Sequence, residues 1–168
     1  SVIDRVVEHM TQRNGNPHRG SHILAIEASE DYENARDRVV EFINAREREE
    51  VIFTRNSTES MNLIAHSYGL HNVKKGDKIV ITVAEHHANL VTWQYVAEQT
   101  GATLEYMYLD EHGHLKDGEI NKIDEKTKIV AFAHVSNVLG MEFPVKELTE
   151  KAHSVGAIVV LDLSLIHI

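Results

Sequence analysis

Cysteine is absent from this 168-residue chain, which excludes disulfide bonds, thiolate metal sites and a thiol nucleophile within it. A chain without cysteine fits a reducing compartment, so we expect a cytoplasmic protein. Long hydrophobic runs are also lacking, and none approaches the length that spans a membrane. Ser1 lies inside a predicted helix and not in a signal peptide, so we expect the chain to begin after the natural start.

The chain has fewer basic than acidic residues. The chain has 17 Lys and Arg against 26 Asp and Glu, which gives a net charge of −9. Nucleic acids and anionic membranes attract concentrated basic patches, and Lys74 and Lys75 are too few to make one. We therefore expect neither nucleic acid nor a membrane as partner. The hydrophobic content of 42% is ordinary for a globular domain.

Helical and strand patterns alternate along the chain. Apolar spacing at three and four residues predicts an amphipathic helix over 28–45, packed on a core, after a first helix that begins near Val2. Strands are predicted over 51–54, 78–81, 103–109, 128–133 and 157–162, and helices over 59–68, 88–99, 117–123 and 144–154. The last strand is expected to be fully buried. This alternation predicts an α/β fold with a mostly parallel sheet and helices on both of its faces.

Hydroxyl side chains stand at the first predicted junction between a strand and a helix. Ser57 and Thr58 follow Thr54, Arg55 and Asn56. Helix N-termini attract anions through their unpaired N–H groups, so this segment could bind a phosphate. The alternative is an ordinary N-cap, which Ser and Thr supply in most helices.

Two adjacent histidines, His86 and His87, stand at the second such junction. A zinc site would need further ligands at matched spacing, and the sequence has neither a His-Glu-x-x-His helix nor a cysteine, so we expect no metal. The functional alternative is an imidazole stacked on an aromatic cofactor. The plain alternative is a pair of solvated loop residues.

Asn137 and Asp162 follow two further predicted strands. Each has a plain alternative, an Asn that holds its own turn and an Asp in a loop. Ligands of open α/β sheets bind beyond the carboxyl ends of the strands, where the loops converge. Polar groups after several successive strands therefore predict a binding site at that edge.

Five segments together resemble the cysteine desulfurases of the SufS type, which belong to the class V aminotransferases. They are His18-Arg19-Gly20, Arg55-Asn56-Ser57-Thr58-Glu59, Glu85-His86-His87-Ala88-Asn89, His134-Val135-Ser136-Asn137-Val138-Leu139-Gly140 and the strand that ends at Asp162. The resemblance runs from about Val2 to Asp162. It implies residues 1–162 as the N-terminal part of a PLP-binding large domain of fold type I. It also implies a homodimer that transfers sulfur from L-cysteine to an acceptor protein for iron-sulfur cluster assembly.

The resemblance also implies residue roles in binding pyridoxal 5'-phosphate. Ser57 and Thr58 match the phosphate-binding pair, and His86 matches the catalytic histidine that stacks on the pyridine ring. Asn137 matches a residue near the ring hydroxyl, and Asp162 matches the acid that pairs with the ring nitrogen. His18 and Arg19 match a loop near the entrance to the active site and the dimer contact.

The segment after Asp162, residues 163–168, does not resemble the family, and we expect it to be foreign sequence. The lysine that holds the cofactor covalently, the small domain and the catalytic cysteine are missing from the chain. We therefore expect a truncated fragment that is inactive alone. Two alternatives stay open: another class V enzyme such as an aminotransferase, selenocysteine lyase or epimerase, and a non-catalytic half-domain that binds a phosphate compound or a partner.

Overall fold

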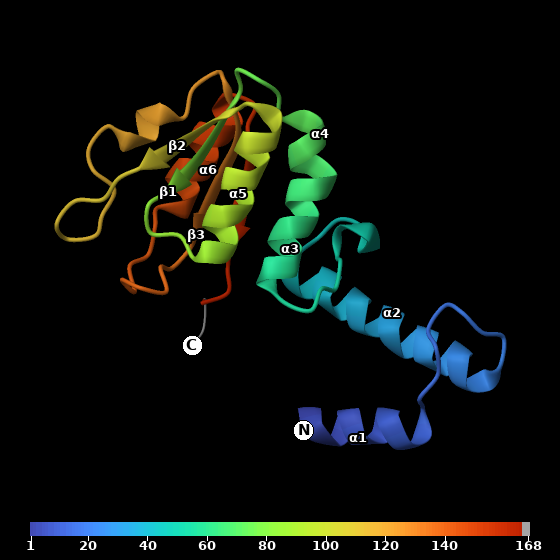
Figure 1. Ribbon diagram of the computed structural model, residues 1–168. Helices are drawn as coiled ribbons and strands as arrows, with labels where there is room; N and C mark the ends of the chain where they lie inside the picture. Colours follow the sequence, from blue (N-terminus) through green and yellow to red (C-terminus); the bar gives the residue numbers. More distant parts are fainter. Residues whose placement is uncertain (166–168) are drawn as a thin grey trace. The chain divides into compact units, whose positions relative to one another are not determined.

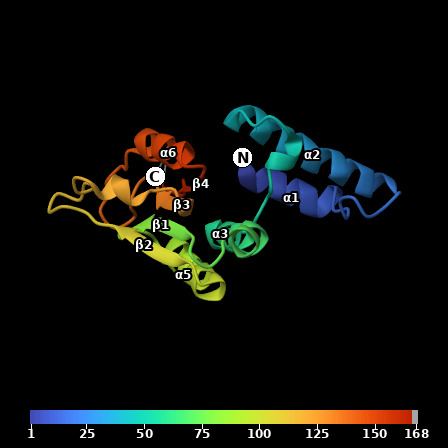
Figure 2. The same ribbon diagram turned by 90° about the horizontal axis from the view of Figure 1, so that it is seen from above.

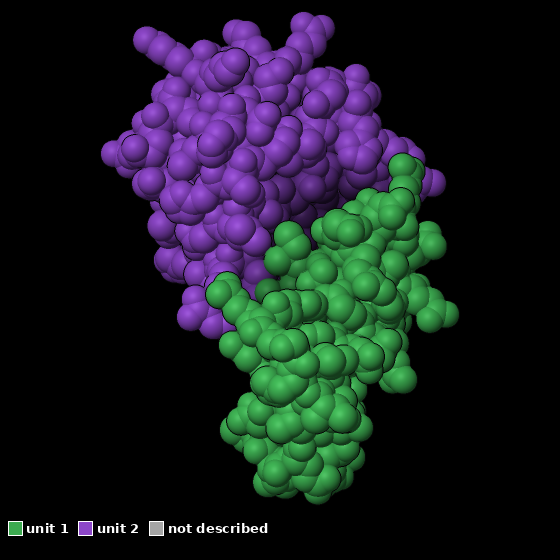
Figure 3. All heavy atoms as spheres, turned by 90° about the vertical axis from the view of Figure 1, so that its right-hand side faces the viewer, with its two compact units in different colours: residues 1–53 green, residues 54–168 purple. Residues whose placement is uncertain are grey.

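The computed structural model describes residues 1–165. The chain divides into two compact units, Ser1–Phe53 and Thr54–Ile168 (Figure 3). Residues 166–168, and with them half of the segment that we expect to be foreign, lie outside the described residues. No helix among the described residues is long and apolar enough to cross a bilayer.

The elements follow one another largely as the periodicity predicts. In chain order they are α1 (Val2–Gln12), α2 (Ile23–Ile43), η1 (Arg48–Glu50), α3 (Ser57–Ile64), η2 (Ala65–Gly69), α4 (Leu70–Asn72), β1 (Lys78–Thr82), α5 (His87–Thr100), β2 (Thr103–Met107), η3 (Glu119–Lys122), β3 (Thr127–Ala133), α6 (Val145–Ser154) and β4 (Ile158–Asp162). The segments η1 and η3 are 3-10 helices, and η2 is a π-helical continuation of α3. The short helix predicted over 117–123 is therefore the 3-10 helix η3.

All four strands of the second unit are parallel, in the order β2-β1-β3-β4. Their carboxyl ends therefore lie at one edge of the sheet. Gly101 makes the turn from α5 into β2 possible, because it caps the helix at φ 72°, a conformation that side chains with a Cβ rarely adopt.

Helices cover both faces of this sheet, as predicted. Alternate strand residues point to opposite faces, so Ile79 and Ile81 pack on α3, η2 and α5, with Trp93 fully buried among them. Val80 and Phe132 pack on the other face against α6 and η3. Figure 2 shows α6 on one side of the strands and α3 and α5 on the other. The prediction of an α/β fold with a parallel sheet is confirmed.

Two strand predictions need correction. Residues 51–54 form no strand, because an apolar run becomes a strand only beside a hydrogen-bonded neighbour, and this run pairs with none of the four strands. Instead, Phe53 stacks edge-on against Tyr32 at 5.4 Å. β4 is also not fully buried. It lies at the edge of the sheet, and Val160 is its one buried residue.

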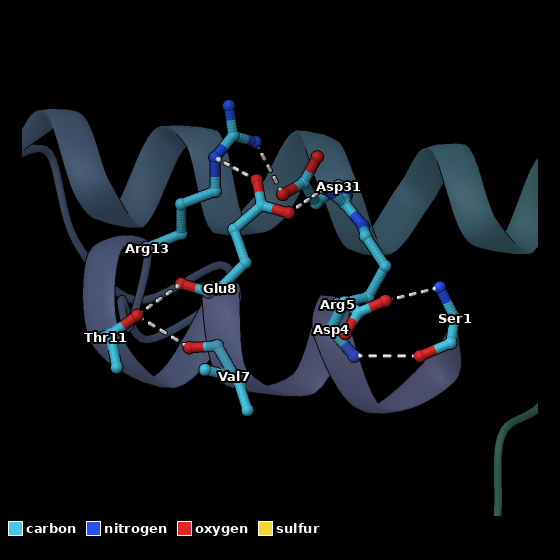
Figure 4. Close-up of polar contacts among 8 residues, drawn as sticks. All are labelled: Ser1, Asp4, Arg5, Val7, Glu8, Thr11, Arg13 and Asp31. Carbon is cyan, nitrogen blue, oxygen red and sulfur yellow. Dashed lines mark hydrogen bonds and ion pairs between the residues drawn. The ribbon is translucent and has the colours of Figure 1, made fainter.

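The first unit consists of α1, α2 and η1 with their connections (Figure 1). Ser1 and Asp4 form a capping box at the start of α1. Arg13 Nη1 donates to Asp31 Oδ2 at 2.9 Å and so ties the end of α1 to α2 (Figure 4). The expected packing of the whole α2 face is wrong. Ala25 and Ala28 are its buried residues, and Phe42 is 88% exposed.

Candidate functional site

One cavity of about 400 Å³ opens at the carboxyl edge of the sheet, and all five predicted cofactor-binding residues line it. Its lining residues are Asn56, Ser57, Thr58, His86, Ala133, Val135, Asn137, Asp162, Ser164 and Leu165. They come from the start of α3, the turn between β1 and α5, the loop after β3, and the end of β4. The parallel topology brings these four segments together because each follows or faces a strand end at the same edge.

The start of α3 supplies hydroxyls and free amides. The N-cap is Asn56, whose Oδ1 accepts the Glu59 amide at 2.9 Å. Ser57 and Thr58 are therefore the first two helical residues, and the alternative that they serve as the N-cap is wrong. The N–H groups of a first helical turn have no acceptor within the helix, which suits them to bind an anion. Arg55 also pairs with Glu59 and holds the pKa of that carboxyl below its ordinary value.

His86 is the N-cap of α5. Its Nδ1 accepts the Ala88 amide at 3.1 Å. The His86 and His87 rings are nearly perpendicular, at 87° with centroids 6.5 Å apart. His86, and not His87, lines the cavity.

The loop after β3 places Asn137 in the cavity lining. Ser136, which is buried, holds this loop: its Oγ accepts the Leu139 amide at 3.3 Å and donates to the Ala84 carbonyl at 3.3 Å. Its backbone amide donates to the Met141 carbonyl at 3.0 Å. The plain alternative for Asn137 is that its side chain holds the turn. In the structure Ser136 holds it. Sequence reasoning assigned no role to this serine.

Asp162 is the last residue of β4, at the carboxyl edge of the sheet, and it pairs in register with Ala133 of β3. Its Oδ1 accepts both the amide of Ser164, at 3.0 Å, and the Ser164 hydroxyl. The same hydroxyl lies 2.8 Å from Ser57 Oγ. Ser164 thus connects the predicted phosphate end of the cavity to the predicted ring-nitrogen end. Sequence reasoning did not anticipate this contact.

A half-buried acidic residue, Glu85, directly precedes His86 and does not line the cavity. Its oxygens accept hydrogen bonds from the Thr82 hydroxyl and from Asn89 Nδ2, the latter at 2.7 Å. Burial raises the pKa of Glu85, and the charge of Asp162 acts in the same direction, while these hydrogen bonds oppose the shift. The spacing of Glu85, Asn89 and Trp93, four residues apart, is the sequence signal that could have revealed this group.

His18 and Arg19 belong to the first unit. His18 has φ 61° and its Nε2 lies 3.1 Å from Glu33 Oε1, and its ring stacks edge-on against Tyr32 at 5.7 Å. These contacts fix the loop within its own unit. That the loop lies near the entrance to an active site stays a prediction.

The family model for class V aminotransferases matches residues 1–165. This chain belongs to that family. A cysteine desulfurase from Haloferax volcanii is 51% identical over 164 residues, which cover 96% of this chain and 38% of that protein. The chain is thus a homologue of the cysteine desulfurases within the class V family.

Solved structures agree with this family. A cysteine desulfurase from Thermococcus onnurineus has a TM-score of 0.89 at 41% identity, covering 96% of this chain and 40% of that one. The Escherichia coli cysteine desulfurase CsdA has a TM-score of 0.80 at 34% identity, covering 95% of this chain and 40% of that one. The chain therefore spans about two-fifths of the length of these three relatives.

Proposed function

We propose that the full-length protein is a cysteine desulfurase dependent on pyridoxal phosphate, and that this chain supplies one part of the cofactor pocket. The observation that carries the proposal is the single cavity lined by Ser57, Thr58, His86, Asn137 and Asp162. These residues lie on four separate segments of the chain, so their meeting in one cavity is not a consequence of sequence proximity.

The donors and acceptors of the cavity fit the chemistry of this cofactor. The first turn of α3 offers amides and hydroxyls to a phosphate group. Asp162 offers a carboxylate to a protonated ring nitrogen, and His86 offers a flat imidazole ring. When bound, pyridoxal phosphate supplies an electron sink for the carbon next to the amino group of the substrate. The residues of this chain bind and orient it.

Within this proposal, Asp162 sets the electronic state of the ring by stabilising a proton on its nitrogen. His86 covers the ring face, with its own orientation set by the bond from the Ala88 amide to Nδ1. Asn137 can donate to or accept from the ring hydroxyl. We further propose that the full-length protein is a cytoplasmic homodimer that takes L-cysteine as substrate and delivers sulfur to an acceptor protein. Sedimentation of the full-length protein, and transfer of labelled sulfur from cysteine, would test these two statements.

The test is a titration of the purified chain with pyridoxal phosphate, followed by absorbance, then by borohydride reduction and mass spectrometry. We expect saturable binding without a lysine adduct at the cavity. Asp162→Asn should weaken binding about tenfold or more, because it removes a charge-assisted contact. Asp117→Asn, at an exposed site in a different cavity, is the matched control and should bind like the unmodified chain. Equal affinities for the unmodified chain and Asp162→Asn would contradict the assignment.

A further inference from the structure

The Glu85 carboxyl group connects the end of β1 to the start of α5. Thr82, the last residue of β1, donates its hydroxyl proton to Oε1, and the same hydroxyl accepts the Ala84 amide at 3.2 Å. Thr82 is completely buried. A carboxyl that accepts a hydrogen bond from a fully buried threonine holds the turn in one place, because water does not reach the threonine hydroxyl to replace it.

The other carboxyl oxygen extends this connection into the helix. Oε2 accepts from Asn89 Nδ2 at 2.7 Å, and Asn89 Oδ1 accepts from Trp93 Nε1 at 2.6 Å. Asn89 and Trp93 are both fully buried, and Trp93 packs in the core between α5 and the sheet. The network therefore anchors the first turns of α5 to the core through polar contacts whose partners are also buried.

His86 lies between the two anchors. It follows Glu85 directly and precedes the helical residue Ala88 that donates to its Nδ1. Glu85 does not line the cavity, whereas His86 does. Glu85 therefore acts on the His86 ring through the turn that carries it, and its coupling to Asp162 is a separate, electrostatic one.

We propose that Glu85 is a positioning residue for His86: its carboxyl group, bonded to the buried side chains of Thr82 and Asn89, ties the end of β1 to the first turn of α5 and thereby sets the direction from which the His86 ring reaches the cavity. The inference rests on the proposed function in one respect, that His86 contacts the cofactor. The arrangement of the turn itself does not depend on it.

The test compares three variants of the full chain. Glu85→Ala removes both acceptors. Glu85→Gln keeps an oxygen for Asn89 and offers an NH₂ group to the Thr82 hydroxyl, which can accept it. Glu98→Gln, at an exposed position further along α5, is the matched control.

Two readouts separate positioning from folding: the ring C–H resonances of His86 by NMR, and the affinity for pyridoxal phosphate. We expect Glu85→Ala to move the His86 resonances and to weaken binding about tenfold, through loss of two hydrogen bonds in the turn. Glu85→Gln should restore both close to the values of the unmodified chain. Glu98→Gln should change neither.

Unchanged His86 resonances in Glu85→Ala would overturn the proposal. If Glu85→Ala does not fold, Thr82→Val decides the question, because it removes one donor at similar volume: moved His86 resonances support the proposal and unmoved resonances overturn it. If the unmodified chain does not bind pyridoxal phosphate, the proposed function fails while the resonances still decide the positioning role.

Discussion

At the scale of single residues, Ser164 contacts two of the residues that we propose for cofactor binding. Its hydroxyl lies 2.8 Å from Ser57 Oγ and bonds Asp162 Oδ1, so it occupies groups at both ends of the cavity. A phosphate at Ser57 and a ring nitrogen at Asp162 would each compete with it. Under the proposed function, the bonds to Ser164 would therefore oppose cofactor binding.

Ser164→Ala should bind pyridoxal phosphate more tightly than the unmodified chain, by about threefold to tenfold, because a net hydrogen bond of about 0.5 to 1.5 kcal/mol no longer has to be broken. Absorbance titration measures the change. Ser154→Ala, which removes another exposed hydroxyl at the end of α6, is the control and should have no effect. Equal or weaker binding by Ser164→Ala would show that Ser164 does not compete with the cofactor.

The raised pKa of the Glu85 carboxyl predicts a pH dependence of stability. Between the ordinary carboxyl pKa and the raised one, the folded chain holds a proton at Glu85 that the unfolded chain has lost. The free energy of unfolding therefore falls as pH rises through this window. Glu85→Gln cannot titrate, so its stability relative to the unmodified chain should increase with pH over the same range. Urea unfolding at a series of pH values checks this, and parallel curves for the two chains would contradict it.

How much of the site could be predicted differs from residue to residue. Asp162 and His86 follow recognisable strand patterns, and a parallel sheet brings such positions together, so their meeting was predictable. The roles of Asn56 and Ser136 were not, because Ser, Thr and Asn all cap helices and hold turns, and the backbone geometry decides which one does so. Glu85 was missed although its spacing to Asn89 and Trp93 is visible in the sequence, because the sequence alone does not show that Thr82, Asn89 and Trp93 are buried.

At the scale of elements, the periodicity of apolar residues predicted the positions of the helices well. It predicted less well whether their apolar faces are buried. α1 has apolar residues at helical spacing, yet none of its residues is buried, and Val2 and Ile3 are 81% and 74% exposed. The core of the second unit behaves differently, since Trp93 and Phe132 are fully buried. Apolar residues at helical spacing indicate that a helix has an apolar face. They do not indicate which other element covers that face.

Removal of residues 1–12 should therefore leave the thermal midpoint of the chain within about 2 °C of its original value, because no buried side chain is lost. It should also lower the binding of a hydrophobic dye, because the exposed apolar residues of α1 are removed. Circular dichroism and dye fluorescence measure the two effects. A fall of many degrees in the midpoint would show that α1 packs on the rest of the chain in solution.

At the scale of the whole molecule, the chain spans about two-fifths of the length of the three cysteine desulfurases named above. It contains a four-stranded parallel sheet with its own two-sided core and a cavity at the carboxyl edge. The topology was predictable because strands and helices alternate along the sequence. The edge position of β4 was not, because strand order depends on pairing between distant segments.

The chain alone should release no sulfide or alanine from cysteine in the presence of pyridoxal phosphate, because it contains no cysteine to accept the sulfur. A colorimetric sulfide assay with amino-acid analysis measures both products. The full-length protein is the positive control. Cysteine-dependent release of equal alanine and sulfide above the level of free pyridoxal phosphate would contradict this expectation.

The central claim is that the cavity at the carboxyl edge of the sheet is a pyridoxal phosphate site. The most direct measurement is an NMR titration of the isotope-labelled chain with pyridoxal phosphate, which locates binding residue by residue. We predict that the largest shifts fall on Ser57, Thr58, His86, Asn137 and Asp162. Shifts confined instead to the separate cavity between residues 113–120 and 142–147 would contradict the account, and so would no shifts at all.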